Sequence, residues 1–251
     1  MMESKKIQLM GYHLNCDHPQ FNRSGSDKDG RALIKKRKLR RFYSRGAEKC
    51  LISTRKLLLS AGLNIDDPTI KFGLYATQYG YLHPMPCELL PEWEPDGIKS
   101  VNDIYQAMWT SERVNPFLIT LSLSNNLLGV LSQELGLQGD CASFLRGNMG
   151  LLSAFKEAEL LLNNGVIDYA LVVASGMGKV GDAPQSDASE TFVEFGVTFI
   201  LTRSAQEDYP IIDIASLSRL YHEGHYSAET LSFINDIAEV MSSTELIENF
   251  N

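Results

Sequence analysis

The feature that most constrains the fold is a series of short apolar runs that alternate with segments of helical period. Residues 166–174 (VIDYALVVA) and 196–202 (GVTFILT) are mainly aliphatic or aromatic and carry one charged residue between them, which predicts buried strands. Residues 39–61 and 152–162 instead place apolar side chains three or four positions apart, and a glycine follows each segment soon after. That spacing predicts amphipathic helices with defined ends. Strands that alternate with helices predict an α/β fold, with helices layered on a mixed, mostly parallel sheet.

Further elements complete this pattern. We expect shorter strands or apolar runs at 6–11, 70–77, 141–145 and 211–215. We expect helices at 101–109, 125–135 and from Ser227 onward. No internal repeat is evident, and 251 residues suffice for one large domain or two small ones. We expect a single domain over residues 1–251.

Composition excludes several classes of protein. The longest apolar stretches are far shorter than the roughly 20 residues of a transmembrane helix, so we expect no membrane span. The first residues lack a continuous apolar region and predict no secretory signal. Four scattered cysteines without CxxC spacing predict reduced thiols and a cytoplasmic protein: Cys16, Cys50, Cys87 and Cys141.

Charge is distributed unevenly. The net charge is −8, yet residues 31–45 contain eight basic side chains and no acidic one. Such a window is a candidate surface for an anionic partner, either nucleic acid or an acidic carrier protein, or a solvated start of a helix. No zinc-finger, RRM or helix-turn-helix signature accompanies it, so we expect no nucleic-acid partner.

Two motifs suggest cofactors, but their surroundings argue against both. Residues 176–181 read GxGxxG after a predicted strand, but the acidic, proline-containing segment that follows does not predict the helix that binds a pyrophosphate. His222 and His225 lie three residues apart with Glu223 as their one adjacent carboxylate and no nearby cysteine, which favours surface histidines over a metal site. We therefore expect neither cofactor nor metal.

No side chain stands out as an activated nucleophile. Ser175 lacks the GxSxG arrangement of a nucleophile elbow. Cys141 lies near a plausible catalytic turn, but its neighbours place it inside a predicted strand, where a small buried cysteine is ordinary packing.

Several short motifs follow one another in a fixed order: residues 115–117 (NPF), 123–129 (LSNNLLG) and 135–139 (LGLQG). They resemble a helix start and glycine turn of the β-ketoacyl synthase family. Residues 157–174 resemble its helix ending in NxG with the following strand, and 194–201 resemble a later glycine-containing strand. The resemblance implies the N-terminal half of a thiolase-like fold, with the C-terminal half of the family absent.

The chain departs from the family at its catalytic residues. The family's acylated cysteine lies nine residues after the glycine that corresponds to Gly139, and Asn148 stands at that position. A carboxamide cannot form a thioester, and the family's two catalytic histidines belong to the missing half. The chain therefore resembles the non-catalytic chain-length-factor subunits of type II polyketide synthases, in particular the small subunit of aryl-polyene pigment clusters.

This resemblance implies a heterodimer with a full-length ketosynthase, and transient binding of an acyl carrier protein. A dimer interface would form at Cys141, Ala142, Ser143, Phe144 and Leu145. The partner's acyl tunnel would be lined, unless these residues are simply core, by Ile104, Met108, Gly147, Asn148 and Met149. The carrier protein would dock on Lys35, Lys36, Arg37, Lys38, Arg40, Arg41 and Arg45.

Two alternatives remain open from the sequence. The chain could be an independent thiolase-fold acyl-transfer enzyme that uses Cys141 or Ser175. It could also be a binding module for a carrier protein or an anionic polymer, built around the basic window.

Overall fold

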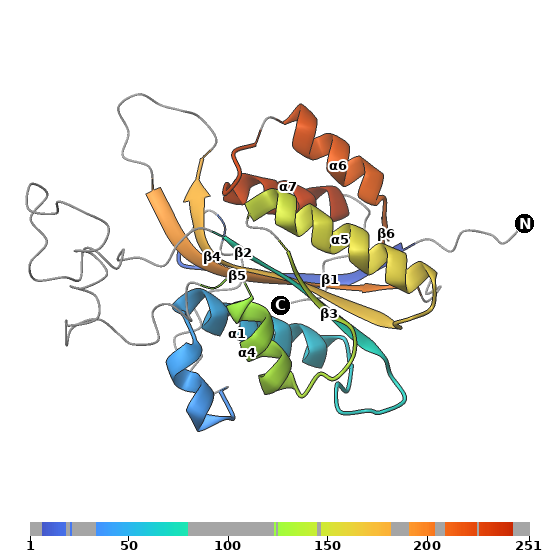
Figure 1. Cartoon of the computed structure of the whole chain (residues 1–251). Coiled ribbons are helices and arrows are strands. Elements are labelled where there is room, and N and C mark those ends of the chain that lie inside the picture. Colours follow the sequence, from blue (N-terminus) through green and yellow to red (C-terminus); the bar gives the residue numbers. More distant parts are fainter. Residues whose placement is uncertain are drawn as a thin grey trace, which may run out of the picture.

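The protein is a three-layered α/β structure, with helices on both faces of one sheet (Figure 1). The computed structural model describes residues 7–18, 21, 34–79, 123, 125–144, 147–181, 191–203, 209–224 and 226–242. One face is covered by α5 (Gly147–Asn163), α6 (Ile214–Glu223) and α7 (Leu231–Ser242). The other face carries the short 3-10 helix η2 (Arg37–Phe42), α1 (Arg45–Ser60) and α4 (Asn126–Leu135).

The described strands form a six-stranded sheet in the order β3-β2-β4-β5-β1-β6. Their bounds are β1 Ile7–Cys16, β2 Phe72–Tyr79, β3 Cys141–Phe144, β4 Tyr169–Val180, β5 Thr191–Thr202 and β6 Ile211–Ile212. Strand β2 pairs in parallel with both β3 and β4. The pairs β4–β5, β5–β1 and β1–β6 are antiparallel.

The sheet is therefore mixed, as predicted, but the prediction that it is mostly parallel is wrong. Ten residues separate β4 from β5, which is too short a connection for the crossover that adjacent parallel strands need. The two strands consequently pair as a long hairpin, and β1 then adds antiparallel to the far side of β5. The α/β layering predicted from alternating elements is confirmed.

Most predicted elements are present with shifted ends. The helix expected over 39–61 is two helices, because the Ser44 side chain caps a new helix by accepting a hydrogen bond from the Ala47 amide at 3.1 Å. The strand expected at 166–174 continues to Val180, and the first strand extends to Cys16. The helix expected at 101–109 lies outside the described residues.

Two apolar cores sandwich the sheet because successive side chains of a strand point to opposite faces. In β4, Val172 and Ala174 join the core under α5 and α7, whereas Leu171 and Val173 join the core under α1 and α4. The strand is buried on both faces, which explains why its sequence is a continuous apolar run. Among the described residues, none of the helices has the length and hydropathy needed to cross a membrane.

Helix α1 lies very close to β5. A Cβ atom on Gly196 would lie 2.1 Å from the backbone nitrogen of Cys50, so a glycine is needed at this contact. The close approach also brings two buried hydroxyls together, since the Oγ1 atoms of Thr54 and Thr198 are 2.8 Å apart. Here α1 is fixed to the sheet by direct contact with its backbone.

Candidate functional site

Position 148, where the resemblance places the family's nucleophile, is a buried junction of three segments. Asn148 is fully buried in the first turn of α5. Its Oδ1 accepts a hydrogen bond from the Tyr79 hydroxyl at 2.5 Å, which joins α5 to the end of β2. Its Nδ2 donates to the carbonyl oxygens of Ser227 at 2.8 Å and Thr230 at 3.4 Å. The junction thus ties α5 to β2 and to the segment before α7.

Gly147 determines how the chain enters this junction. Its φ is +74°, which glycine adopts without strain, and a Cβ atom there would lie 2.1 Å from the carbonyl oxygen of Ala228. The next amide, of Asn148, donates to the same Ala228 oxygen at 2.8 Å. The start of α5 and the segment 227–230 are therefore in direct backbone contact.

The junction has little capacity for proton transfer or covalent chemistry. Burial raises the pKa of Tyr79 well above its ordinary value, so its hydroxyl is a neutral donor to Asn148. The Asn148 carboxamide is neither a nucleophile nor a base. Among the described residues, the hydrogen bonds of this junction join neutral groups only.

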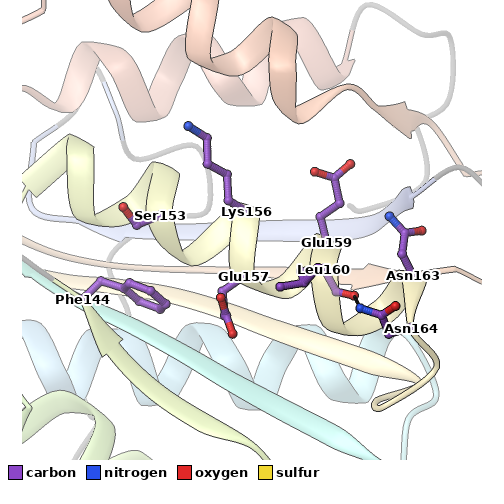
Figure 2. Close-up of a pocket in the computed structure, with 8 residues that line it drawn as sticks. All are labelled: Phe144, Ser153, Lys156, Glu157, Glu159, Leu160, Asn163 and Asn164. Carbon is purple, nitrogen blue, oxygen red and sulfur yellow. Dashed lines mark hydrogen bonds between the residues drawn. The ribbon is translucent and has the colours of Figure 1, made fainter.

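Met149 and the exposed face of α5 present a different surface. Met149 is 48% exposed, while the neighbouring Gly147 and Asn148 are buried within the chain. A shallow groove of about 550 Å³ lies along the exposed face of α5 beside Phe144 of β3, and Figure 2 shows its lining. Phe144 and Glu157 lie on the β3 side of α5 in that view, and Lys156 and Glu159 point away from it. The other lining residues are Ser153, Leu160, Asn163 and Asn164.

The predicted dimer strand is the edge of the described sheet. Strand β3 pairs with β2 on one side and has no described strand on the other. Cys141 is exposed, and Ala142, Ser143 and Phe144 are partly exposed. Leu145, like the predicted tunnel residues Ile104 and Met108, lies outside the described residues. An edge strand with accessible side chains can add a strand from another chain.

The predicted carrier-protein residues are close in sequence and all exposed, and we call them together the basic surface; Arg45 lies 3.9 Å from the Glu194 carboxylate. It comprises Lys35, Lys36, Arg37, Lys38, Arg40, Arg41 and Arg45, all of them exposed. Buried Glu134 on α4 holds its backbone, accepting hydrogen bonds from the amides of Lys35 and Lys36 at 2.9 Å each. The Arg55 guanidinium also contacts the Glu134 carboxylate, at 3.3 Å. The backbone is thereby anchored while the cationic side chains point into solvent.

The other candidate nucleophiles, Ser175 and Cys141, have no catalytic partner among the described residues. Ser175 is buried in β4 opposite Gly196 of β5, and desolvation raises the pKa of the Cys141 thiol above its ordinary value. No histidine among the described residues hydrogen-bonds to either side chain. The geometry therefore gives no support to an enzyme built on Ser175 or Cys141.

The remaining motifs are placed as follows. Residues 176–180 belong to β4, so the first five residues of the GxGxxG sequence continue a strand. His222 lies in the last turn of α6, and His225 lies outside the described residues. No group of three or more potential ligands in the described part of the chain is arranged to hold a metal ion.

Comparison with known proteins identifies the fold. No protein-family model matches the chain, and neither does any curated protein. A type II polyketide synthase acyl carrier protein in complex with its ketosynthase matches with a TM-score of 0.55 and 15% identity, over 97% of this chain and 83% of that one. The ishigamide ketosynthase/chain length factor matches with a TM-score of 0.52 and 12% identity, over 79% of this chain. This chain has a ketosynthase-like fold.

The extent of the match varies between structures. The chain spans 58% of the ishigamide protein chain it matches, less than two thirds of that length. A ketosynthase in complex with its chain length factor from Xenorhabdus doucetiae matches with a TM-score of 0.46 and 15% identity, over 80% of each chain. The thiolase-like fold predicted from the sequence is confirmed by the two matches with TM-scores above 0.5.

Within this ketosynthase-like fold, the sequence located Asn148 but not its partners. Tyr79 lies 69 residues from Asn148 along the chain, and the carbonyls of Ser227 and Thr230 lie 79 and 82 residues away. No local pattern marks such distant contacts. Glu134 was also missed, although a carboxylate among the apolar positions of a predicted helix is a signal that a buried partner exists.

Proposed function

We propose that this chain is a non-catalytic, chain-length-factor-like subunit that forms a heterodimer with an active β-ketoacyl synthase. In this role it stabilises the ketosynthase and shapes its acyl-chain pocket in a type II polyketide system. The observation that carries the proposal is Asn148, a buried carboxamide with neutral partners at the position of the family's cysteine. Such a site cannot form the acyl-enzyme that a condensation needs, so the active site would belong to the partner.

The edge of the sheet supports a partner on the β3 side. Strand β3 ends the described sheet, and exposed apolar side chains flank it: Met149 is 48% and Leu160 is 53% exposed. A strand added to β3 would continue the sheet into the partner while its flanking helices cover the groove along α5. Stable interfaces bury about 1,200–2,000 Å² in total, which requires the edge and the α5 face together.

The similar structures support the class of partner. One is a ketosynthase/chain length factor, and the other is an acyl carrier protein in complex with its ketosynthase. We extend these partners to this chain and place the complex in the cytoplasm. We further propose that residues 1–251 act as one ketosynthase N-terminal-like domain, and that the system is of the aryl-polyene type.

The basic surface suits an acidic carrier protein. Its seven cationic side chains stand apart from a chain whose remaining residues are strongly acidic. Complementary charge steers association and fixes orientation, and its effect weakens as salt screens it. We expect carrier-protein binding to the complex to be transient and to decrease with ionic strength.

The test is the mass in solution of this chain, expressed alone and with the ketosynthase encoded beside it. Size exclusion with light scattering is expected to give a 1:1 complex on co-expression, and aggregation or poor yield of the chain alone. A well-behaved monomer or homodimer that does not bind the ketosynthase contradicts the proposal.

A matched pair of variants locates the interface. Leu160→Glu places a charge on the proposed interface, and Leu59→Glu does the same on α1 across the sheet, where Leu59 is 83% exposed. Burying a leucine contributes about 1.5–3 kcal/mol, so L160E is expected to weaken the complex at least about tenfold. L59E is expected to leave affinity unchanged. Equal effects of the two variants would exclude α5 from the interface.

A further inference from the structure

The junction at Asn148 leaves no group free to receive a ligand. An amide side chain offers one carbonyl oxygen and two N–H donors. Tyr79 uses the oxygen, and the carbonyls of Ser227 and Thr230 use the nitrogen. Asn148 is therefore occupied by the protein itself.

The start of α5 is occupied in the same way. The first amides of a helix have no acceptor within the helix, and their partial positive charge favours anions and oxyanions at this place. Here the carbonyl oxygen of Ala228 accepts from the Asn148 amide at 2.8 Å and touches the Cα of Gly147 so closely that a side chain there would clash. A peptide carbonyl thus lies where a thiolate or a tetrahedral oxyanion would otherwise be stabilised.

The segment that supplies this carbonyl is firmly anchored on both sides. The Lys179 amide donates to the carbonyl of Glu229 at 2.8 Å, and Thr230 forms a parallel bridge with Lys179 at the end of β4. Leu231 and Phe233, at the start of α7, are fully buried in the core. Moving the segment out of the junction would break its bonds to the end of β4 and pull on buried Thr230 and Leu231 at the start of α7.

We propose that residues 227–230 are a built-in plug that closes the nucleophile site of this chain. Residues 227–230 then keep acyl groups out of the site at position 148. Replacing Asn148 with cysteine would therefore not create an acylation site. The plug involves residues of this chain alone, so the proposal can be tested without any ketosynthase partner.

The experiment compares thiols at adjacent positions. In the full chain with Cys141→Ser and Cys87→Ser, a cysteine is introduced either as Asn148→Cys or as Met149→Cys, and modification by iodoacetamide is timed by intact-mass spectrometry. Both thiols lie in the first turn of α5, but Asn148 is buried and Met149 is 48% exposed. Iodoacetamide is smaller than any acyl thioester, so a site closed to it is closed to substrates.

N148C is expected to react at least about 100-fold more slowly than M149C, because reaction requires the plug and α7 to open. The two rates should converge in 6 M guanidinium. Reaction of native N148C within tenfold of M149C would overturn the proposal.

A measurement on the unmodified chain covers the case in which N148C does not fold. Hydrogen exchange with mass spectrometry is expected to show the amides of Asn148 and Lys179, which donate to the plug's carbonyl oxygens of Ala228 and Glu229, protected as strongly as the rest of β4. Exchange of the peptide that carries the Asn148 amide near the rate of an unstructured peptide would equally overturn the proposal.

Discussion

The replacement of Asn148 by aspartate tests the junction with almost no change in shape. Aspartate keeps an oxygen for the Tyr79 hydroxyl but places a second oxygen against the carbonyls of Ser227 and Thr230, at contacts now 2.8 and 3.4 Å long. Two donated hydrogen bonds are lost, which costs about 1–3 kcal/mol in total. A buried carboxylate facing carbonyl oxygens adds a desolvation cost, so we expect a loss of about 3–5 kcal/mol at pH 7.5.

The loss should depend on pH in a defined direction. Burial and the two carbonyls raise the pKa of the introduced carboxyl in the folded state above its unfolded value of about 4. Below pH 4 it is protonated in both states, and only the hydrogen-bond loss remains. As pH rises from about 4 toward the folded-state pKa, the variant loses about 1.4 kcal/mol per pH unit.

Urea denaturation followed by circular dichroism at pH 5 and 7.5 measures both effects. Asn164→Asp is the control, because Asn164 is exposed at the end of the same helix and also donates its Nδ2 to a main-chain carbonyl, of Leu160, at 2.9 Å. We expect the control to lose less than about 1 kcal/mol. Equal losses of stability for the two variants, or a loss for N148D that does not change with pH, would refute the claim that Asn148 is buried against two carbonyl oxygens.

Three further predictions follow from other contacts. Gly196→Ala is expected to lower the free energy of unfolding by about 2 kcal/mol or more, because the added Cβ would lie 2.1 Å from the backbone of α1. The control, Gly129→Ala on α4, has nothing within 4 Å of the added Cβ and should be neutral or stabilising in the same denaturation assay. Glu134→Gln removes the negative charge that binds the amides of Lys35 and Lys36 and the guanidinium of Arg55. It should therefore speed hydrogen exchange of residues 35–42 and lower the free energy of unfolding by about 1–3 kcal/mol. Unchanged exchange of residues 35–42 would contradict this prediction. Iodoacetamide should modify the exposed thiol of Cys141 in the native chain, and faster as the pH rises toward the raised pKa of that thiol. It should not modify Cys50, because burial makes this thiol inaccessible and raises its pKa to about 12.

The spacing of apolar residues and the positions of glycines predicted most helices and strands, because burial and backbone conformation at each element depend on its own residues. The apolar run of β4 is buried on both faces, and the glycine that follows α5 has a φ of +68°. The direction of β5 was not predictable in the same way. Its sequence is equally apolar whichever way it runs, and its antiparallel pairing comes from the short link to β4 and from β1, almost 200 residues earlier.

The candidate site was predictable only at its centre. Spacing from Gly139 located position 148, and the amide there excluded a thioester. The hydrogen bonds of Asn148 to Tyr79 and to the plug were not predictable, because they join residues 69 to 82 positions apart and no local residue pattern encodes such contacts. The basic surface was visible as a run of charges, while the anchoring Glu134 lies about 100 residues further along the chain.

The same junction also affects how the chain folds during its synthesis. Tyr79 and Asn148 leave the ribosome long before Thr230, so the part of this core that α7 completes stays uncovered while some 80 further residues are made. Contacts between distant segments slow folding, and uncovered apolar surface favours aggregation during that delay. Helix α7 is thus needed to complete a core whose other members are translated much earlier, which lengthens the time during which the nascent polypeptide exposes apolar surface.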